Sequence, residues 1–540
     1  MHLSSPIYRM LRDRYAYAPR EPVSTFIGLT ALIASVGVPV AAAGAIGGFL
    51  ITTALSVGLS LASQALANRN RSTLPGGQGT LGGSSGALDP AIRSPQTSPL
   101  PEQRLVLGTV TTSGQTFFRR WDPPYLWRGL LLAAHECGDL QQLLMNTQAV
   151  PLEDPGTGIL RAKSAPFYDG STRFIEISYR NGDANQEIDP IIARDFPTMP
   201  TTFQQRGHAT VVIKAHYGAN DNAHKDLYGS NNVFNPLIRF QGARYFDPRV
   251  SGCVLEDPNT WVSGDNASLN FARWLTHPWP NMRLVDPAKI DWDKIAEAAD
   301  IDDKWRGRAD GTKERNHTAA GVILSSSDAF QVARELLTAC DGLLINNAGK
   351  YYVLPGHPRD PIGTIGQDML AGGFELHTET PDRDLINIVK TENIDAARDY
   401  KPVVGPVLRR DDLIAQDGKA LETTLTLPFT EGSARAQRLA SRRLLESRGT
   451  GSGRSGRKGF SGTFTLEAAR YKAGDIVRIE FRDFDKVTDV YQIMKTQRDE
   501  TLTRITLEAV SYSNARFDWH APTDEQAMQL DQDVLDAEAA

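Results

Sequence analysis

The chain contains 540 residues, of which 58 are basic and 64 acidic, so its formal net charge is −6. This length excludes a single small binding module, because domains hold roughly 100 to 200 residues, and the charge excludes histone-like binding of nucleic acid through a global positive field. The three cysteines, Cys137, Cys253 and Cys340, lie far apart and form no CxxC pair, which excludes a four-thiolate metal site and a disulfide scaffold.

The amino-terminal part is the most apolar segment of the chain. No charged residue occurs between Pro22 and Asn68, and a helix that spans a bilayer needs about 20 apolar residues. The segment predicts two spans if it breaks at Gly47-Gly48, or one span and a short arm if it breaks at Pro39. A plain membrane anchor and helices bundled inside a larger assembly both fit this pattern. The residues expected to plug an assembly or to contact a membrane are the large apolar ones, namely Phe26, Ile27, Leu29, Leu32, Ile33, Ile46, Phe49, Leu50, Ile51, Leu55, Leu59, Leu61 and Leu66.

We divide the chain at changes of composition. Residues 1–68 combine a basic arm with the apolar segment, which we expect to be helical, and residues 69–104 form a linker rich in Gly, Ser and Pro. A first β-rich part covers residues 105–255, in which Arg173 to Tyr179 and Thr210 to Tyr217 show the two-residue alternation of half-buried strands. Residues 147–206 form either a separate small inserted barrel or part of the first one.

A mixed α and β part follows over residues 256–353. Apolar residues recur at three- and four-residue steps from Phe330 to Cys340, behind a helix-start signal that ends at Asp328. Shorter helices are predicted at 268–275 and 292–299.

The closing part, residues 354–519, is predicted to be mostly antiparallel and similar to a β-barrel. A basic helix at 434–448 leads through a flexible loop into strands, which we expect at 475–481, 490–496 and 502–510. Residues 520–540 are acidic and contain no Lys or Arg, which predicts a disordered tail.

The loop after the basic helix reads as a literal GxGxxG at residues 451–456. A dinucleotide-binding turn must follow a strand and open a helix, whereas here a helix precedes and a strand follows, so we interpret it as a flexible loop. The loop and the helix together hold the most concentrated basic cluster of the chain. We expect a solvated face, with contact to nucleic acid or to an acidic partner as the alternative. The members are Arg435, Arg438, Arg442, Arg443, Arg454, Arg457 and Lys458.

Residue patterns for metal binding or catalysis are weak. His135-Glu136 lacks the second histidine four residues later that a zinc-binding helix needs. His216 and His224 are eight residues apart without a third ligand in view, so they are interpreted as surface histidines. No Gly-x-Ser-x-Gly nucleophile elbow between a strand and a helix is predicted, and no cysteine has a catalytic frame. We therefore expect no metal, no cofactor and no enzymatic activity.

An ordered set of landmarks carries a resemblance over roughly Leu105 to Trp519. The first is Gln241-Gly-Ala-Arg-Tyr-Phe-Asp-Pro-Arg249. Through Tyr245, Asp247, Pro248 and Arg249 it is similar to a "G-x-x-x-Y-D-P-R" pattern, with Phe246 as an additional residue beside the tyrosine. The others are Glu256-Asp-Pro-Asn259, the 268–275 helix, Gly349-Lys350-Tyr351, Lys472-Ala-Gly-Asp-Ile-Val477 and the stretch from Tyr512 to Trp519. In number and order they resemble the tail-tip hub family of long-tailed phages, the family of the lambda host-specificity protein J.

This resemblance implies an α+β, β-rich fold with several hub domains, including small antiparallel β-barrels. It implies a virion protein at the distal end of the tail, where a homotrimer forms a ring that closes the tail tube and takes part in host attachment and DNA ejection. The implied partners are the tail tube or distal tail protein and other tip and fibre proteins, with DNA only as passing cargo. The lambda protein's fibronectin-like and receptor-binding extension has no counterpart in this sequence, so receptor binding is expected of another polypeptide.

Within this setting, the apolar segment is either a plug of the tip or an element that enters the host envelope membrane. A rival hypothesis from another class is a membrane-anchored bacterial protein whose β-rich body binds a partner.

Overall fold

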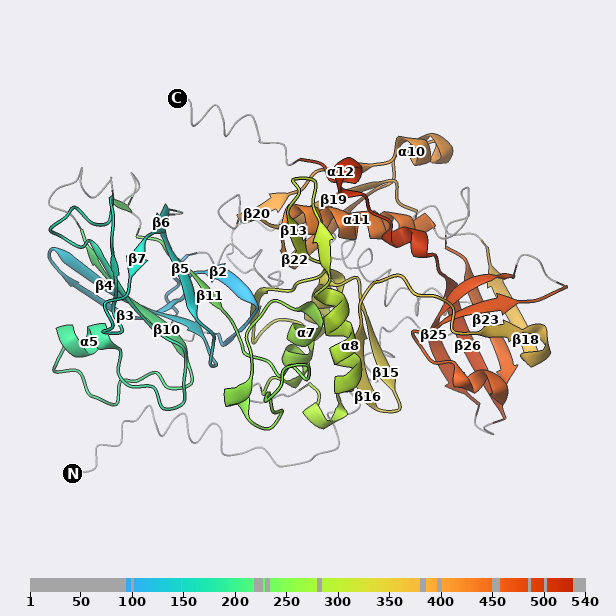
Figure 1. The fold of residues 1–540 in the computed structure, drawn as a ribbon, viewed down its shortest axis with the longest axis horizontal. Helices are drawn as coiled ribbons and strands as arrows, with labels where there is room; N and C mark the ends of the chain where they lie inside the picture. The colour runs from blue at the N-terminus through green and yellow to red at the C-terminus, as the bar shows by residue number, and fades with distance from the viewer. Residues whose placement is uncertain are drawn as a thin grey trace, which may run out of the picture. The chain divides into compact units, whose positions relative to one another are not determined.

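A computed structural model describes residues 94–98, 102–146, 148–217, 227–228, 234–278, 284–378, 385–395, 401–448, 457–483, 487–499 and 503–527. All of them fall in one compact unit of the chain. The predicted β-rich α+β fold is confirmed, because several sheets alternate with a small number of helices (Figure 1). The apolar segment lies outside the described residues. Among the helices of the described part, none combines the length and the apolar character needed to cross a bilayer.

Two antiparallel sheets share the first core. Leu130 and Ile213 from one sheet pack with Leu143, Ile238 and Phe240 from the other, and all five side chains are fully buried. The six-stranded sheet has the order β3 (Gln115–Asp122), β4 (Tyr125–Ala133), β10 (Ala209–His216), β9 (Ile175–Arg180), β8 (Leu160–Ala162) and β7 (Leu152–Glu153). The four-stranded sheet has the order β2 (Thr109–Thr112), β11 (Pro236–Gln241), β5 (Leu140–Met145) and β6 (Gln148–Val150).

Strand β10 is buried on both faces, whereas a half-buried strand was predicted there. Helix α5 (Pro190–Asp195) places Ile191 and Ile192 against Val212 on the face opposite the first core. A strand covered on both faces loses its polar alternation, which explains the run of buried residues from Ala209 to Ile213. Within residues 147–206, β7, β8 and β9 belong to the same sheet as β10, whereas β6 belongs to the four-stranded sheet.

The middle of the chain contains three helices, α7 (Ala267–Thr276), α8 (Trp292–Asp302) and α9 (Ala329–Ala339). Each begins directly after an Asn or Asp, namely Asn266, Asp291 and Asp328, whose side chain accepts a backbone N–H of the first turn. Helices α7 and α8 lie beside each other (Figure 1). The same region holds three antiparallel pairs: β1 (Arg104–Leu107) with β14 (Gly321–Leu324), β12 (Trp305–Gly307) with β13 (Lys313–Arg315), and β15 (Leu343–Asn347) with β16 (Lys350–Leu354).

The final third contains two cores. One lies beneath α11 (Ser433–Arg448), where β19 (Ile388–Asp395) pairs in parallel with β22 (Glu422–Glu431). Strands β20 (Lys401–Val404) and β21 (Leu408–Arg409) pair with β19, and helix α10 (Asp411–Asp417) completes the crossover to β22. This parallel pair differs from the predicted antiparallel pattern, because a crossover through a helix returns the chain in the same direction.

The other core belongs to a six-stranded sheet. Its order is β17 (Thr364–Gly366), β24 (Ile476–Glu480), β25 (Asp489–Arg498), β26 (Arg504–Ser511), β23 (Gly459–Thr465) and β18 (Leu370–His377). Phenylalanines fill it, with Phe460, Phe464 and Phe481 fully buried. The pairs from β24 to β18 are antiparallel, whereas β17 and β24 are parallel.

Residues 520–527 correct the prediction of a tail disordered from residue 520. They include helix α12 (Ala521–Asp524), and the Gln526 N–H donates to Oε1 of Gln437 on α11 at 2.8 Å. Glu525 accepts the N–H of Ala309 at 2.9 Å. Glu525 therefore binds a distant donor that composition alone does not reveal. Residues 528–540 lie outside the described range.

Candidate functional site

The 241–249 landmark begins with a close approach of backbones. A Cβ at Gly242 would stand 2.5 Å from the carbonyl oxygen of Val106, so this position accepts no side chain without movement of the backbone. The Gly242 N–H donates to the Gly108 oxygen at 2.7 Å. Tyr245 follows as a buried residue that exchanges two backbone hydrogen bonds with Val262. The landmark is thus tied to the segments before and after it.

Arg249 joins this landmark to helix α8. Its Nε and Nη2 atoms donate to the two oxygens of Asp247 at 3.0 and 2.8 Å, and Pro248 occupies the turn between them. Nη1 lies 3.0 Å from Asp300 and Nη2 lies 2.9 Å from Asp303. The hydrogen bond with Asp247, followed by those with the other two carboxylates, raises the pKa of Arg249.

Phe246, the additional residue of the landmark, also contacts α8. Its ring meets that of Trp292 edge to face, with centroids 4.9 Å apart. The four residues singled out from the sequence, Tyr245, Asp247, Pro248 and Arg249, therefore lie together in one described turn. Through these contacts, the landmark connects the first β-rich part to helix α8.

The basic cluster on α11 is buried, and its interpretation as a solvated face is wrong. Of its members, Arg435, Arg438 and Arg442 are between 3% and 7% exposed, and the side chains of Arg443 and Arg457 are 12% exposed. Arg438 donates to Glu314 on β13, and Arg435 lies 3.6 Å from the same carboxylate. The carboxylates that pair with these arginines come from distant parts of the chain, which is why the helix alone reads as a surface element. Arg454 lies outside the described residues.

The carboxyl end of α11 repeats this arrangement. Arg448 forms a two-pronged pair with Asp417, through Nη1 at 2.9 Å and Nη2 at 2.5 Å. The same guanidinium donates to the Ile386 oxygen. A bidentate pair of this kind holds a carboxylate in a defined orientation, so α11 is fixed against α10.

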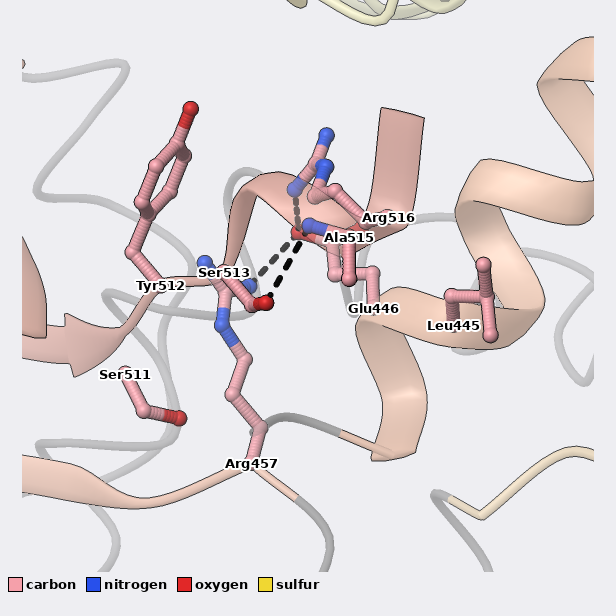
Figure 2. Close-up of a pocket in the computed structure, with 8 residues that line it drawn as sticks. All are labelled: Leu445, Glu446, Arg457, Ser511, Tyr512, Ser513, Ala515 and Arg516. Carbon is pink, nitrogen blue, oxygen red and sulfur yellow. Dashed lines mark hydrogen bonds and ion pairs between the residues drawn. The ribbon is translucent and has the colours of Figure 1, made fainter. Parts of the chain in front are cut away.

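Glu446 is the centre of a small pocket of about 60 Å³ (Figure 2). Its Oε1 lies 2.7 Å from Arg457 and 3.3 Å from Arg516, and its Oε2 lies 3.3 Å from Arg443. Arg516 also binds Asp341 at 2.5 Å. Burial by itself raises the pKa of Glu446, but the charges of Arg457, Arg516 and Arg443 outweigh burial and hold that pKa at about 2. The carboxylate is therefore ionised at neutral and mildly acidic pH.

A chain of hydrogen bonds connects α7 and α8 to α11. Asp302 accepts the N–H and the hydroxyl of Ser268 at 2.8 and 2.6 Å, and its other oxygen lies 2.8 Å from Nδ1 of His317. Arg442 donates to Nε2 of His317 at 2.7 Å. Because a guanidinium only donates, His317 is neutral and carries its proton on Nδ1.

The pKa values in this chain follow from burial. Burial lowers the pKa of His317 well below its usual range, and Arg442 and its neighbours add to the effect. Burial raises the pKa of Asp302 to about 7, although the hydrogen bonds from Ser268 act in the opposite direction. Ser268 binds the aspartate instead of the imidazole, and all three side chains are at most 1% exposed. In this arrangement the serine is held as a structural donor.

The remaining residues that the sequence singled out are separated from this cluster. His135 is buried and its Nε2 accepts the N–H of Val106 at 3.0 Å; burial lowers its pKa to about 4. His216 is half-buried between Tyr125 and Phe174, and His224 lies outside the described residues. All three cysteines are free. Within the described ranges, no group of three His, Cys, Asp or Glu is arranged to hold a metal ion.

The apolar candidates, from Phe26 to Leu66, and the 451–456 loop lie outside the described residues. Sequence reasoning missed the acidic half of the network, namely Asp302, Glu314, Asp341, Asp417 and Glu446, together with His317. A weak signal existed for Glu446, which follows Arg443 at the three-residue spacing of a helical ion pair. The other acids carry no local signal.

Comparisons with known proteins bear on this region. Residues 328–496, which run from the start of α9 into β25, match the sequence profile of the family described as "Putative phage tail protein". No curated protein matches the chain.

The solved structures that match the chain include three from phage tails or virions. A chain from the virion of a native gene transfer agent particle has 17% identity and a TM-score of 0.49, with 87% of this chain and 99% of that chain covered. The 43 kDa tail protein of prophage MuSo2 from Shewanella oneidensis has 10% identity and a TM-score of 0.27, with 76% and 100% covered. The prophage tail protein gp18 from Listeria monocytogenes EGD-e has 9% identity and a TM-score of 0.24, with 74% and 87% covered. By the family match, residues 328–496 are related in sequence to phage tail proteins.

Proposed function

We propose that this protein is the structural hub of a phage tail tip. Three copies form a ring that closes the distal end of the tail tube, organises the neighbouring tip and fibre proteins, and takes part in host attachment and DNA ejection. The observation that carries the proposal is the match of residues 328–496 to a phage tail family. The matched range contains all of α11, around which the buried ionic network is built.

The geometry of that network supports a structural role. Arg438, Arg448 and Arg457 each bind a carboxylate from outside their own element, and Arg249 does the same across the first junction. Removing one partner of a buried pair, such as Arg438 with Glu314 or Arg448 with Asp417, costs about 3 to 5 kcal/mol. The buried pairs therefore oppose separation of the elements that they join. A tip that transmits the force of attachment needs junctions of this kind.

The role proposed here is non-enzymatic. The Ser268, Asp302 and His317 chain is enclosed by protein, and its atoms serve to connect helices. The partners that follow from the proposal are two further copies of the chain, the tail tube or distal tail protein, and other tip and fibre proteins. DNA passes through the ring as cargo.

The apolar amino terminus has two roles within this proposal, as a plug of the ring or as an element that enters the host envelope. Replacing Leu50 and Leu55 by Asp separates them, because two carboxylates oppose insertion into lipid. If the segment enters the membrane, particles of normal composition that carry both substitutions lose DNA ejection. Normal ejection by such particles would contradict membrane entry and leave the plug hypothesis.

The experiment that tests the hub is localisation in purified particles. A gold-binding tag at the carboxyl terminus should appear only at the distal end of the tail in electron micrographs. If the protein were absent from particles and recovered with cell membranes, the hub proposal would be overturned. That outcome would favour a membrane-anchored bacterial protein with a β-rich partner-binding body, which the uncharged stretch from Pro22 to Asn68 also fits.

A further inference from the structure

The pocket beside Glu446 lies where three segments of the closing part meet (Figure 2). Its walls come from the carboxyl end of α11, from Arg457 just before β23, and from the end of β26 with the turn that follows it. Its volume is about 60 Å³, which holds about four to six water molecules, because each needs about 10 to 15 Å³ of a cavity. Ala515 on the wall is exposed, so solvent reaches the pocket. A small ion therefore fits, whereas a nucleotide or a sugar is too large.

Two hydrogen-bond donors of the wall lack an acceptor among the described residues. Nε of Arg516 is buried and has no hydrogen-bond partner there. The Ser513 hydroxyl accepts the N–H of Ala515 at 3.2 Å, and its own proton is left for another acceptor, because a hydroxyl donates as well as accepts. Figure 2 shows Arg516 on one side of the Glu446 carboxylate, and Ser513 and Arg457 on the other. A ligand whose acceptor atoms point in several directions suits these donors.

Two arginines close to the pocket form no ion pair with a carboxylate of the described residues. Arg442 on α11 is 5% exposed, and its hydrogen bonds go to uncharged side chains. Arg359 donates to a backbone oxygen, and its guanidinium lies 5.8 Å from the ring centroid of Tyr512 on the pocket wall. Arg442 and Arg516 lie 5.2 and 4.8 Å from the ring centroid of Phe517. Burial lowers the pKa of Arg442 and of Arg359, and the charge of Arg516 adds to this effect. Positive charge in excess therefore surrounds the pocket.

We propose that this pocket is a binding site for a small tetrahedral oxyanion, either phosphate or sulfate. The oxygens of the anion accept hydrogen bonds from the Ser513 hydroxyl and from Nε of Arg516, and its charge offsets that of Arg442 and Arg359. Guanidinium groups form strong charge-assisted hydrogen bonds with such oxygens. Because α11 and the turn after β26 both line the pocket, the bound anion joins the helix to the last sheet.

Glu446 by itself repels an anion, but arginines already balance its charge. Its Oε1 binds Arg457 and Arg516, and its Oε2 binds Arg443. Three guanidiniums thus surround this carboxylate, and Arg516 binds one more, that of Asp341. A dianion matches the two further arginines that pair with no described carboxylate. Its tetrahedral oxygens reach donors on both sides of the pocket, whereas the planar carboxylate of acetate reaches one side.

Calorimetric titration of the purified full-length chain with sodium phosphate tests the site. The ionic strength is held constant with sodium chloride, so that general screening of charges does not contribute. We expect saturable binding with one site per chain, competition by sulfate and no competition by acetate. Absence of saturable binding at millimolar phosphate would overturn the proposal, and so would competition by acetate as strong as that by sulfate.

Substitutions of Ser513 locate the bound anion. Ser513→Ala removes the hydroxyl and should raise the Kd for phosphate about tenfold, which corresponds to about 1.4 kcal/mol. Ser513→Thr keeps the hydroxyl and should bind phosphate as the native chain does. The matched control is Ser461→Ala on β23, because Ser461 does not line the pocket; it should leave the Kd unchanged.

Arg516→Lys provides a second variant of the wall. It keeps the positive charge but removes Nε, so it should also raise the Kd about tenfold. This variant keeps the test informative if Ser513→Ala fails to fold, which circular dichroism detects. A native Kd in the folded variants of Ser513 and Arg516, or an equal rise in Ser461→Ala, would overturn the pocket as the site of binding.

Discussion

The Nη1 atom of Arg442 lies 2.7 Å from Nε2 of His317, and this contact determines the proton position on the imidazole. The two residues are 125 positions apart in the chain. Since Nε2 must accept, Nδ1 carries the proton and donates to Asp302 at 2.8 Å. Above the pKa of about 7 that burial gives Asp302, a positive and a negative charge are thereby connected through a neutral ring. The contacts couple helix α11 to helices α7 and α8.

This coupling predicts an unusual pH dependence. The folded protein keeps His317 neutral below its ordinary pKa of 6.5, so that residue makes stability fall as the pH falls below about 6.5. Asp302, with a pKa raised to about 7 from 3.8, makes stability fall as the pH rises from about 4 to about 7. Between about pH 4 and 6.5 the two effects oppose each other and largely cancel.

Asp302→Asn removes one of the two effects. We expect this variant to lose about 2 kcal/mol more than the native chain between about pH 6.5 and 5, at about 1.4 kcal/mol per pH unit. The free energy of unfolding in urea at the two pH values measures it. The variant is weakened at both pH values, so the slope is the informative quantity. His317→Gln should change the slope in the opposite direction, and equal slopes in all three proteins would contradict the opposing pair.

Glu446→Gln tests the centre of the pocket. The substitution leaves Arg443 and Arg457 without their carboxylate, and we expect unfolding to be easier by about 3 kcal/mol at neutral pH. The matched control is Glu297→Gln, because Glu297 pairs with Lys294 on the surface and is 63% exposed; its effect should stay within about 0.5 kcal/mol. Similar losses in the two variants would mean that Glu446 is screened by water.

Arg249 is expected to act through its geometry as well as its charge. Arg249→Ala leaves Asp247, whose side chain is 7% exposed, without its partner, and should cost about 3 kcal/mol. Arg249→Lys keeps the charge but loses the two-pronged contact, so it should restore part of this loss. Thermal unfolding of both variants, with the exposed Arg409→Ala as control, measures the effect. Full rescue by lysine would show that charge alone matters.

Gly242→Ala tests the close approach at the start of the landmark. The new methyl group would meet the Val106 oxygen at 2.5 Å, and overpacking against backbone costs about 1 to 3 kcal/mol. Gly373→Ala on β18 is the control, because nothing lies within 4 Å of its Cβ position. Denaturant midpoints compare the two. An unchanged midpoint for Gly242→Ala would mean that β11 and β1 separate without cost.

Local elements were predictable because they depend on neighbours in sequence. The 330–340 helix was read from its apolar spacing and start signal, and α9 occupies Ala329–Ala339 with Asp328 as its cap. The strands near 175, 210, 476 and 490 were found in the same way. The parallel pairing of β19 with β22 was not predicted, because the direction of pairing depends on the connection between strands and not on the residues within them.

What the sequence determined by itself was the set of elements and the presence of charges: a basic helix at 434–448, an acidic end and a Tyr-Phe-Asp-Pro-Arg landmark. Tertiary structure decided which charges meet. A helix that repeats arginine shows the same spacing whether it faces water or buried carboxylates, and the partners of α11 are the distant residues Glu314 and Asp417. Only the packing of the intervening sheets brings these carboxylates to the arginines of α11, and no local sequence pattern encodes that packing.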